Sequence, residues 1–242
     1  MLFKSLLLLL ALSFSGLLPA DSGGKEILKM MHDRYAGKWY RTLTFNQKTE
    51  MYQNDSLLQT QTWYEALIFP DKFRIDFGPS DSGNSVIYKG DSAFIFRNGK
   101  LRAKRKDAND LTFLLGGMYF YPFDQAVSKM KELGFDLDQS HEDIWKGRPV
   151  YVIGAGKGND TSNQLWIDKE NLYLVRMITL TETRKEEGLF ENHIKLGGGW
   201  TETRVAFYIN GKLVQVETYH DCKANMELDP AIFEHDKLRK WK

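Results

Sequence analysis

The chain is poor in the features on which several classes of protein depend. It has one cysteine, Cys222, which excludes an intramolecular disulfide, and we expect this residue to be a small buried or half-buried apolar group. The charges nearly cancel, with 33 Lys and Arg against 32 Asp and Glu, so the overall balance gives no indication of nucleic-acid binding. A partner must therefore be sought in the pattern of apolar residues.

Catalytic and metal-binding motifs are also missing. The five histidines show no spacing typical of metal ligands, and the sequence contains neither a Gly-x-Ser-x-Gly nucleophile elbow nor a phosphate-binding loop. His220, Asp221 and Cys222 place a base, an acid and a thiol side by side, but adjacent strand residues point to opposite faces, so no triad results. We predict that the protein is not an enzyme and uses neither a metal ion nor a cofactor.

The most apolar segment lies at the N-terminus. Lys4 precedes an apolar run over residues 6–12, and a small-residue exit ends at Ala20. This pattern is typical of a secretory signal peptide, and the run is shorter than the roughly 20 residues that a membrane span needs. No cysteine stands near the exit, so we expect no lipid anchor. The sequence predicts a signal peptide at 1–20 and a single domain at 21–242.

Beyond this segment, the spacing of apolar residues predicts one helix followed by many strands, with a helical insertion in the middle. The stretch from Gly24 to Tyr35 has an apolar stripe of helical period, and from Trp39 the period changes to two. Asn98-Gly99 and Asn210-Gly211 are typical of tight hairpins, which indicate antiparallel neighbours. Helices are also expected over 107–115 and 124–133, and strands over 57–69, 72–77, 84–89, 92–97, 100–104, 143–146, 149–155, 164–168, 172–182, 191–196, 202–209 and 212–221.

Several of these strands are apolar on both faces. Trp63, Leu67 and Phe69 oppose a second apolar row on the same strand, and Phe94 and Phe96 oppose another. Such a strand is covered on both sides or closes over a cavity. Because helical segments are few, we expect the helices to lie inside a curved sheet, where the interior can accept an apolar ligand.

The stretch FPDKFRIDF, residues 69–77, carries this alternation most clearly. We expect Phe73, Ile75 and Phe77 to point inward while Arg74 and Asp76 face water. The alternative is that the three apolar residues are ordinary core.

Five segments, in their order and spacing, resemble the periplasmic lipoprotein-carrier family of LolA. They are Phe45-Asn46-Gln47-Lys48, Phe69-Pro70-Asp71-Lys72-Phe73-Arg74, residues 86–96, residues 164–176 and the closing Leu228-Asp229-Pro230-Ala231-Ile232-Phe233. The resemblance implies an incomplete β-barrel whose concave apolar face holds the acyl chains of lipoproteins on their way through the periplasm to the outer membrane. Each methylene of such a chain costs roughly 0.8 kcal/mol in water, so a carrier needs an apolar cavity rather than chemistry.

The sequence departs from the family at one position. Family members often have a basic residue just before the proline that corresponds to Pro70, thought to bond to the lid and regulate its opening, where this chain has Phe69. If a lid is controlled here, another group controls it. Leu114, Leu115 and Met118 flank or follow Gly116-Gly117 and are candidates for a mobile apolar lid, although helix packing explains them equally well.

The predicted fold class is therefore α+β, mainly antiparallel β, an incomplete (half) β-barrel with helices covering its concave face. We predict a monomeric periplasmic protein that sequesters lipoprotein acyl chains or another lipid, with membrane receptor proteins as further partners and no nucleic acid. The candidate acyl-binding residues are Trp63, Leu67, Phe69, Phe73, Ile75, Phe77, Phe94, Phe96, Leu114, Leu115, Met118 and Met130.

Two alternatives remain open. One is a sensor or interaction module on the same scaffold, which would hold a stable protein partner. The other is a hydrolase, which predicts polar side chains meeting in the cavity, where a carrier predicts a dry apolar wall.

Overall fold

One long antiparallel sheet dominates the protein. The computed structural model describes residues 23–79 and 81–241, so the predicted signal peptide at 1–20 lies outside the described residues. Within them, thirteen strands follow the order β6-β5-β4-β3-β2-β1-β15-β14-β11-β10-β9-β8-β7, and β12 and β13 form a separate hairpin. The predicted α+β class with a mainly antiparallel sheet is confirmed.

The elements have the following bounds. The helices are α1 (Gly24–Tyr35), α2 (Asp110–Leu114) and α3 (Phe123–Glu132), with short 3-10 helices η1 (Gly117–Phe120) and η2 (Pro230–Phe233). The first six strands are β1 (Thr42–Gln53), β2 (Ser56–Ile68), β3 (Lys72–Phe77), β4 (Ser85–Lys89), β5 (Ser92–Arg97) and β6 (Lys100–Lys106). The others are β7 (Ser140–Trp145), β8 (Arg148–Ile153), β9 (Gln164–Asp168), β10 (Leu174–Leu180), β11 (Lys185–Glu191), β12 (Ile194–Leu196), β13 (Gly199–Thr201), β14 (Arg204–Ile209) and β15 (Lys212–Ala224).

Local sequence accounts for many of these boundaries. The apolar stripe of α1 is buried, and the helix has the predicted bounds. Asn98 and Gly99 have φ angles of 50° and 72°, and Asn210 and Gly211 of 50° and 76°, so both pairs adopt the left-handed conformations that two-residue hairpins need. β11 was not predicted, because its sequence KEEGLFE is mostly charged and its apolar residues come only at its end.

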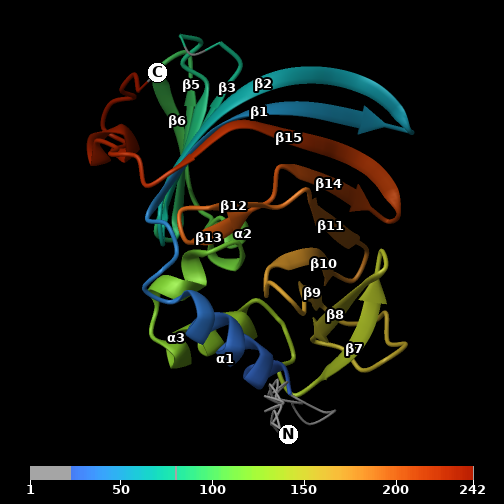
Figure 1. Ribbon diagram of the computed structural model, residues 1–242. Helices are drawn as coiled ribbons and strands as arrows, with labels where there is room; N and C mark the ends of the chain where they lie inside the picture. The colour runs from blue at the N-terminus through green and yellow to red at the C-terminus, as the bar shows by residue number, and fades with distance from the viewer. Residues whose placement is uncertain (1–22, 80, 242) are drawn as a thin grey trace, which may run out of the picture.

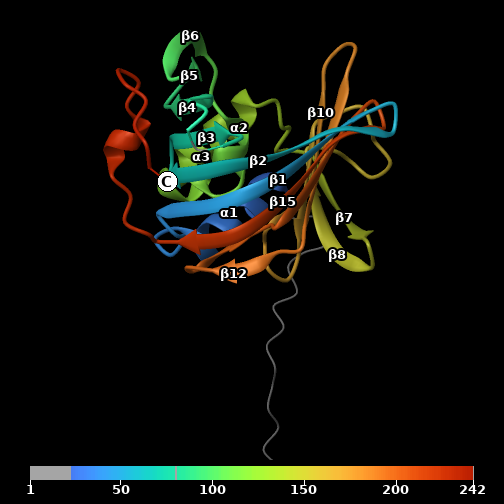
Figure 2. The same ribbon diagram turned by 90° about the horizontal axis from the view of Figure 1, so that it is seen from above.

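The sheet is open and strongly curved. Its edge strands, β6 and β7, do not pair with one another, and the bend brings the two halves of the sheet around the helices (Figures 1 and 2). On the inner side, α1 packs against α3, η1 and β8. This arrangement is compatible with the expected incomplete barrel.

Hydrophobic residues form two clusters, one on each side of the sheet. The larger, inner cluster joins the helices to the concave face and includes Ile27, Met31, Leu67, Phe73, Phe113, Met118, Met130, Ile153, Leu165 and Phe190. The smaller, outer cluster joins Ala66, Ile87, Phe94 and Phe96 to Ile232 and Phe233 of the C-terminal segment. That segment runs outside β3, β4 and β5 (Figure 2).

The C-terminal segment overturns one expectation about β3. Arg74 and Asp76 do not face water: they are 2% and 6% exposed beneath this segment. The Arg74 guanidinium donates to both Asp76 carboxylate oxygens at 2.8 and 2.9 Å and to the Ile232 carbonyl at 2.9 Å. Ser85 and Trp241 also donate hydrogen bonds to Asp76. The alternation within β3 therefore separates an apolar face from a polar face, both of which are buried.

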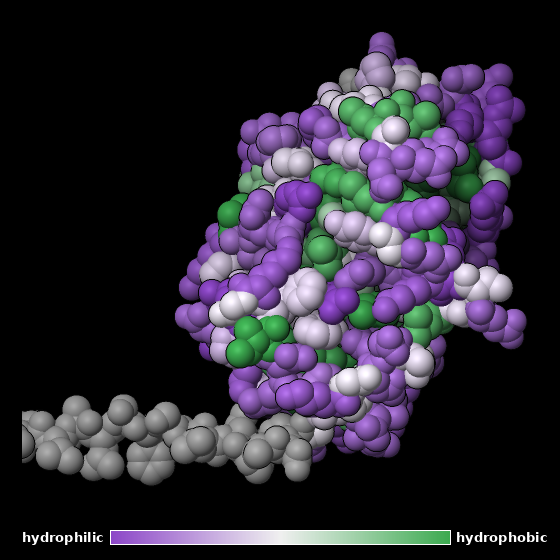
Figure 3. Space-filling view, turned by 90° about the vertical axis from the view of Figure 1, so that its right-hand side faces the viewer, coloured by the Kyte–Doolittle hydropathy of each residue, from purple (hydrophilic) through white to green (hydrophobic). Residues whose placement is uncertain are grey.

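The surface is mainly hydrophilic. The face viewed in Figure 3 shows hydrophobic residues in separate patches within a hydrophilic surface. The large hydrophobic side chains that stay exposed among the described residues are Leu57, Leu58, Leu101, Ile144, Ile194 and Met226. Within residues 23–79 and 81–241, no helix combines the length and the apolar character that a membrane crossing requires.

Candidate functional site

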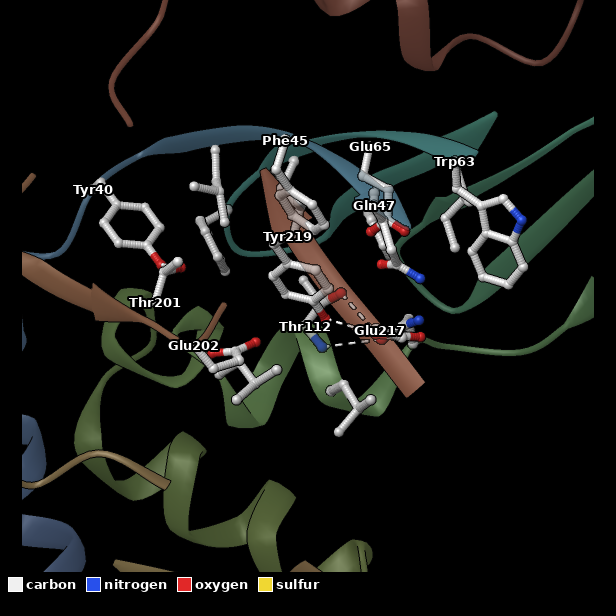
Figure 4. Close-up of a pocket in the computed structure, with 18 of the residues that line it drawn as sticks. Tyr40, Phe45, Gln47, Trp63, Glu65, Thr112, Thr201, Glu202, Glu217 and Tyr219 are labelled. Carbon is white, nitrogen blue, oxygen red and sulfur yellow. Dashed lines mark hydrogen bonds between the residues drawn. The ribbon is translucent and has the colours of Figure 1, made fainter. Parts of the chain in front are cut away.

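A cavity of about 130 Å³ lies between the concave face of the sheet and α2. Its wall comes from β1, β2, β3, β14 and β15 on one side and from the start and end of α2 on the other (Figure 4). The apolar part of the wall consists of Leu43, Phe45, Leu67, Phe69, Phe73, Ile75, Leu111, Leu115 and Phe207. A helix laid across a bent sheet leaves this space because side chains from both sides do not reach one another.

Half of the predicted acyl-binding residues line this cavity. They are Trp63, Leu67, Phe69, Phe73, Ile75 and Leu115. Phe77 lies beside Trp63, with ring centroids 4.8 Å apart, but does not reach the cavity. The sequence predicts that Phe73 and Ile75 point inward, and both side chains line the cavity.

The other predicted residues lie elsewhere. Met118 and Met130 are each 1% exposed within the inner core. Leu114 lines a neighbouring groove rather than the cavity. Phe94 and Phe96 require a correction: they face the outer side of the sheet and pack against the C-terminal segment. The sequence shows that β5 is apolar on both faces but does not show which face lies inside.

The neighbouring groove has a volume of about 490 Å³ and is more polar than the cavity. Asn109, Leu111, Phe207 and Glu217 line both spaces, so the groove continues the cavity toward the surface. Its wall also contains the charged residues Asp107, Asp110, Arg184, Glu186 and Glu187. An elongated ligand could therefore occupy both spaces.

Sequence reasoning missed three glutamates that line the cavity. Glu65 on β2, Glu202 after β13 and Glu217 on β15 are 3%, 7% and 8% exposed. Figure 4 shows these three side chains on different sides of the same space. One feature of the sequence could have indicated Glu65. It lies on the same strand face as Trp63 and Leu67, so an ionisable residue interrupts a row of apolar residues that point inward.

The three carboxyl groups differ in their hydrogen bonds. Glu217 accepts hydrogen bonds from the Gln215 amide at 2.6 Å and from the Tyr219 hydroxyl at 2.8 Å. Among the described residues, no group donates a hydrogen bond to the Glu65 side chain. Its direct cross-strand neighbours are Phe45 on β1 and Ile75 on β3, whose side chains have no hydrogen-bond donor.

Burial raises the pKa of all three carboxyl groups. It raises the pKa of Glu65 well above its usual value, and the negative charges of Glu217 and Glu202 raise it further. Burial raises the pKa of Glu202 to about 8, although its own backbone N–H opposes the shift. The pKa of Glu217 is also raised by burial, against the hydrogen bonds from Tyr219 and Gln215. Burial therefore favours the neutral acid at all three positions, and Glu202, with its pKa of about 8, is mainly protonated at pH 7.

Aromatic rings complete the wall around the carboxyl groups. Phe45 and Tyr219 stack with their centroids 4.3 Å apart, and the Tyr40 hydroxyl lies 2.8 Å from the Thr201 hydroxyl oxygen. No Lys, Arg or His is among the described residues that line the cavity. In the part of the chain that the structure describes, no three His, Cys, Asp or Glu side chains are arranged to hold a metal ion.

Comparisons with known proteins show which solved structures share this fold. No family model matches the chain, and no curated protein matches it in sequence. A DUF1329 family protein from Desulfovibrio piger is 16% identical with a TM-score of 0.59, over 88% of this chain and 96% of that chain. A LolA superfamily protein from Nitrosomonas europaea is 14% identical with a TM-score of 0.57, over 89% and 99%. A domain from Vibrio parahaemolyticus that is named for outer membrane lipoprotein sorting is 11% identical with a TM-score of 0.60. The match covers 88% of this chain and 97% of that chain.

The fold that these structures share with the chain is the one that the sequence motifs indicated. The expected resemblance to LolA-like proteins is therefore confirmed at the level of fold. Function does not follow from this likeness and has to be argued from the site.

Proposed function

We propose that the protein is a periplasmic binding protein that sequesters an alkyl chain between the curved sheet and α2, and that it acts as a carrier in lipoprotein sorting. The observation that carries the proposal is the unfilled space between Leu67 and Phe73 of the sheet and Leu111 of α2 and Leu115, which follows α2. Burying apolar surface there supplies about 0.8 kcal/mol per methylene, with no need for catalysis.

The size of the space supports a single chain as cargo. A dry engineered cavity of about 150 Å³ accepts benzene, so a cavity of about 130 Å³ accepts the end of one alkyl chain. The adjoining groove of about 490 Å³ has room for the rest of that chain. A triacyl group would need the helices to move away from the sheet.

The location in the proposal comes from the sequence. A signal peptide at 1–20 followed by a single binding domain at 21–242 would deliver the protein to the periplasm. The named neighbours with this fold include a lipoprotein-sorting domain, which agrees with that compartment.

The first experiment is mass spectrometry of lipids that copurify with the protein, together with titration of an uncharged dansyl-labelled undecyl chain. Ile75→Trp places a larger side chain in the cavity and should weaken probe binding at least about tenfold. Ile144→Trp makes the same change at a position that is 69% exposed and should leave binding unchanged. A protein that binds neither copurified lipid nor probe would refute the carrier proposal.

The buried glutamates favour a second candidate, a hydrolase. Carboxyl groups with raised pKa values serve as general acids, and a polar cluster in the cavity is what a hydrolase predicts. Against this candidate, no Ser, Cys or His is among the described residues that line the cavity, so neither a Ser–His nor a Cys–His pair is in place there. Release of product from p-nitrophenyl acyl esters that is lost in Glu65→Gln would favour the hydrolase over the carrier.

A further inference from the structure

The three cavity glutamates come from separate elements and have no basic partner. Glu65 projects from β2 and Glu217 from β15, while Glu202 follows the short strand β13. A buried carboxylate is normally paired with a cation or with several donors, as Asp76 is on the outer face. In the cavity that cation is missing among the described residues that line it.

Glu65 is the least satisfied of the three. It is 3% exposed and points into the cavity (Figure 4), yet no described residue donates a hydrogen bond to it. Leaving a buried polar group without a partner costs stability, and an apolar residue at this position between Phe45 and Ile75 would pack without that cost. An unsatisfied acid that faces an open space indicates a ligand that satisfies it.

The surrounding wall defines the chemistry of that ligand. Phe45 and Tyr219 stack beside the carboxyl groups, and Tyr40 and Trp63 contribute further rings. Carboxylates together with aromatic faces are the groups that recognise an ammonium ion. The rest of the wall is aliphatic and aromatic carbon, so the remainder of the ligand must be apolar.

We propose that the cavity selects an alkyl amine, a single-chain amphiphile whose ammonium group is received by Glu65 and Glu202 while its chain packs on the apolar wall. This inference rests on the proposed binding of an alkyl chain and specifies the polar group that the chain carries. A fatty acid or a phosphate ester would bring a negative charge toward three acids and is disfavoured.

Binding of the amine releases protons. The pKa of Glu65 is raised well above its usual value and that of Glu202 to about 8, so Glu202 is mainly protonated at pH 7. The titratable groups around them are Glu217 and Tyr219, with Tyr40 and Cys222 near Glu202. An alkyl ammonium has a pKa near that of lysine, about 10.4, and so enters charged at pH 7. Its positive charge lowers the pKa of the acids beside it, and at least one proton leaves for the solvent.

The test is isothermal titration of the purified protein at pH 7 with dodecylamine, dodecanol and dodecanoate, each below its micelle concentration. We expect dodecylamine to bind at least about tenfold more tightly than dodecanol, and dodecanoate more weakly than either. Repeating the amine titration in two buffers of different ionisation enthalpy should give a release of about one proton per amine, and dodecanol should give none.

Variants locate the effect. Glu65→Gln and Glu202→Gln keep the shape of the neutral acid and should abolish the preference for dodecylamine over dodecanol. Glu142→Gln, at an exposed position on β7, should change nothing. The wild-type buffer experiment keeps the inference testable if a variant fails to fold.

The outcomes separate the two proposals. If none of the three ligands binds, the alkyl-chain function itself fails. If dodecanol and dodecylamine bind equally, or if the amine preference survives both glutamine variants, the function stands and the ammonium site is refuted. Absence of proton release on amine binding also refutes it.

Discussion

The two faces of the sheet bury acidic groups in opposite ways. On the outer face, Asp76 is held by a bidentate hydrogen-bonded ion pair with Arg74. Hydrogen bonds from Ser85 and Trp241 saturate its remaining positions. On the inner face, Glu65 of the neighbouring strand is buried to a similar degree, but no described residue donates to it.

The difference separates a structural acid from a binding acid. The outer network fixes the C-terminal segment against the sheet, since the Ile232 carbonyl and the Trp241 indole both take part in it. The inner acid faces an open space instead, so its hydrogen-bonding capacity is left for a ligand. A buried charge is costly in either place, and what surrounds it decides whether it serves stability or binding.

Breaking the outer ion pair should give the largest effect. Arg74→Met leaves the Asp76 carboxylate buried without its counter-charge, and we expect the free energy of unfolding to fall by about 3–5 kcal/mol in urea titrations. The matched change Arg184→Met breaks a half-exposed pair with Glu186 and should cost less than about 0.5 kcal/mol. Equal losses in the two variants would mean that the outer network is not structural.

Neutralising an inner acid should change the pH dependence of stability instead. The pKa of Glu202 is about 8 in the folded protein against the ordinary 4.5, so its contribution is fully present below pH 4.5 and is lost as the pH rises toward 8. Glu202→Gln has no proton to lose. Its free energy of unfolding relative to wild type should therefore rise by roughly 3 kcal/mol from pH 4 to pH 7.

Urea titrations of both proteins at several pH values check this expectation. Glu65, Glu217, Tyr40 and Cys222 lie around Glu202 and titrate in both proteins, so the difference between the curves isolates the substituted group. Parallel curves would show that Glu202 ionises freely and is not buried as described.

Removing one aromatic ring from each face of the sheet compares how tightly the two faces are packed. Phe96 on the outer face is 1% exposed in a filled cluster, whereas Phe73 on the inner face borders the cavity. Phe96→Ala should lower the free energy of unfolding by about 1–2 kcal/mol more than Phe73→Ala, because the ring next to a void makes fewer contacts. Thermal and urea unfolding measure both. A larger loss for Phe73→Ala would indicate that the inner face is as tightly filled as the outer one.

A substitution on neither face sets the baseline and should have the smallest effect. Leu58 on β2 is 67% exposed. Leu58→Ser should change the free energy of unfolding by less than about 0.5 kcal/mol and should leave binding of the dansyl probe unchanged. Loss of probe binding in this variant would place the ligand on the hairpin rather than in the cavity.

Part of the fold could be read from local sequence. The helix at Gly24–Tyr35, the strand at Lys72–Phe77 and the turns at Asn98-Gly99 and Asn210-Gly211 follow from periodicity and from residues that tolerate positive φ. The inward direction of Phe73 follows from the same alternation. These features depend on neighbours within a few residues, which the sequence displays directly.

The face of the sheet on which Phe94 and Phe96 lie could not be predicted from local sequence. On β5 both faces are apolar, so alternation does not show which face lies inside, and a second apolar cluster covers the outer one. The residues that form it, Ile232 and Phe233, lie more than 130 positions further along the chain. The burial of Arg74 depends on the same distant segment. Local sequence alone therefore predicts that Arg74 faces water.

The sequence by itself determined the alternation of apolar and polar residues, the hairpin order of the strands, and the absence of disulfides and of recognised catalytic motifs. These properties are set by residue type and short-range geometry. Only the tertiary structure decided which face of each strand is concave, where the C-terminal segment lies, and that Glu65, Glu202 and Glu217 meet one cavity. Burial and electrostatic coupling arise from elements that are distant along the chain, and they exist only once the sheet has bent around its helices.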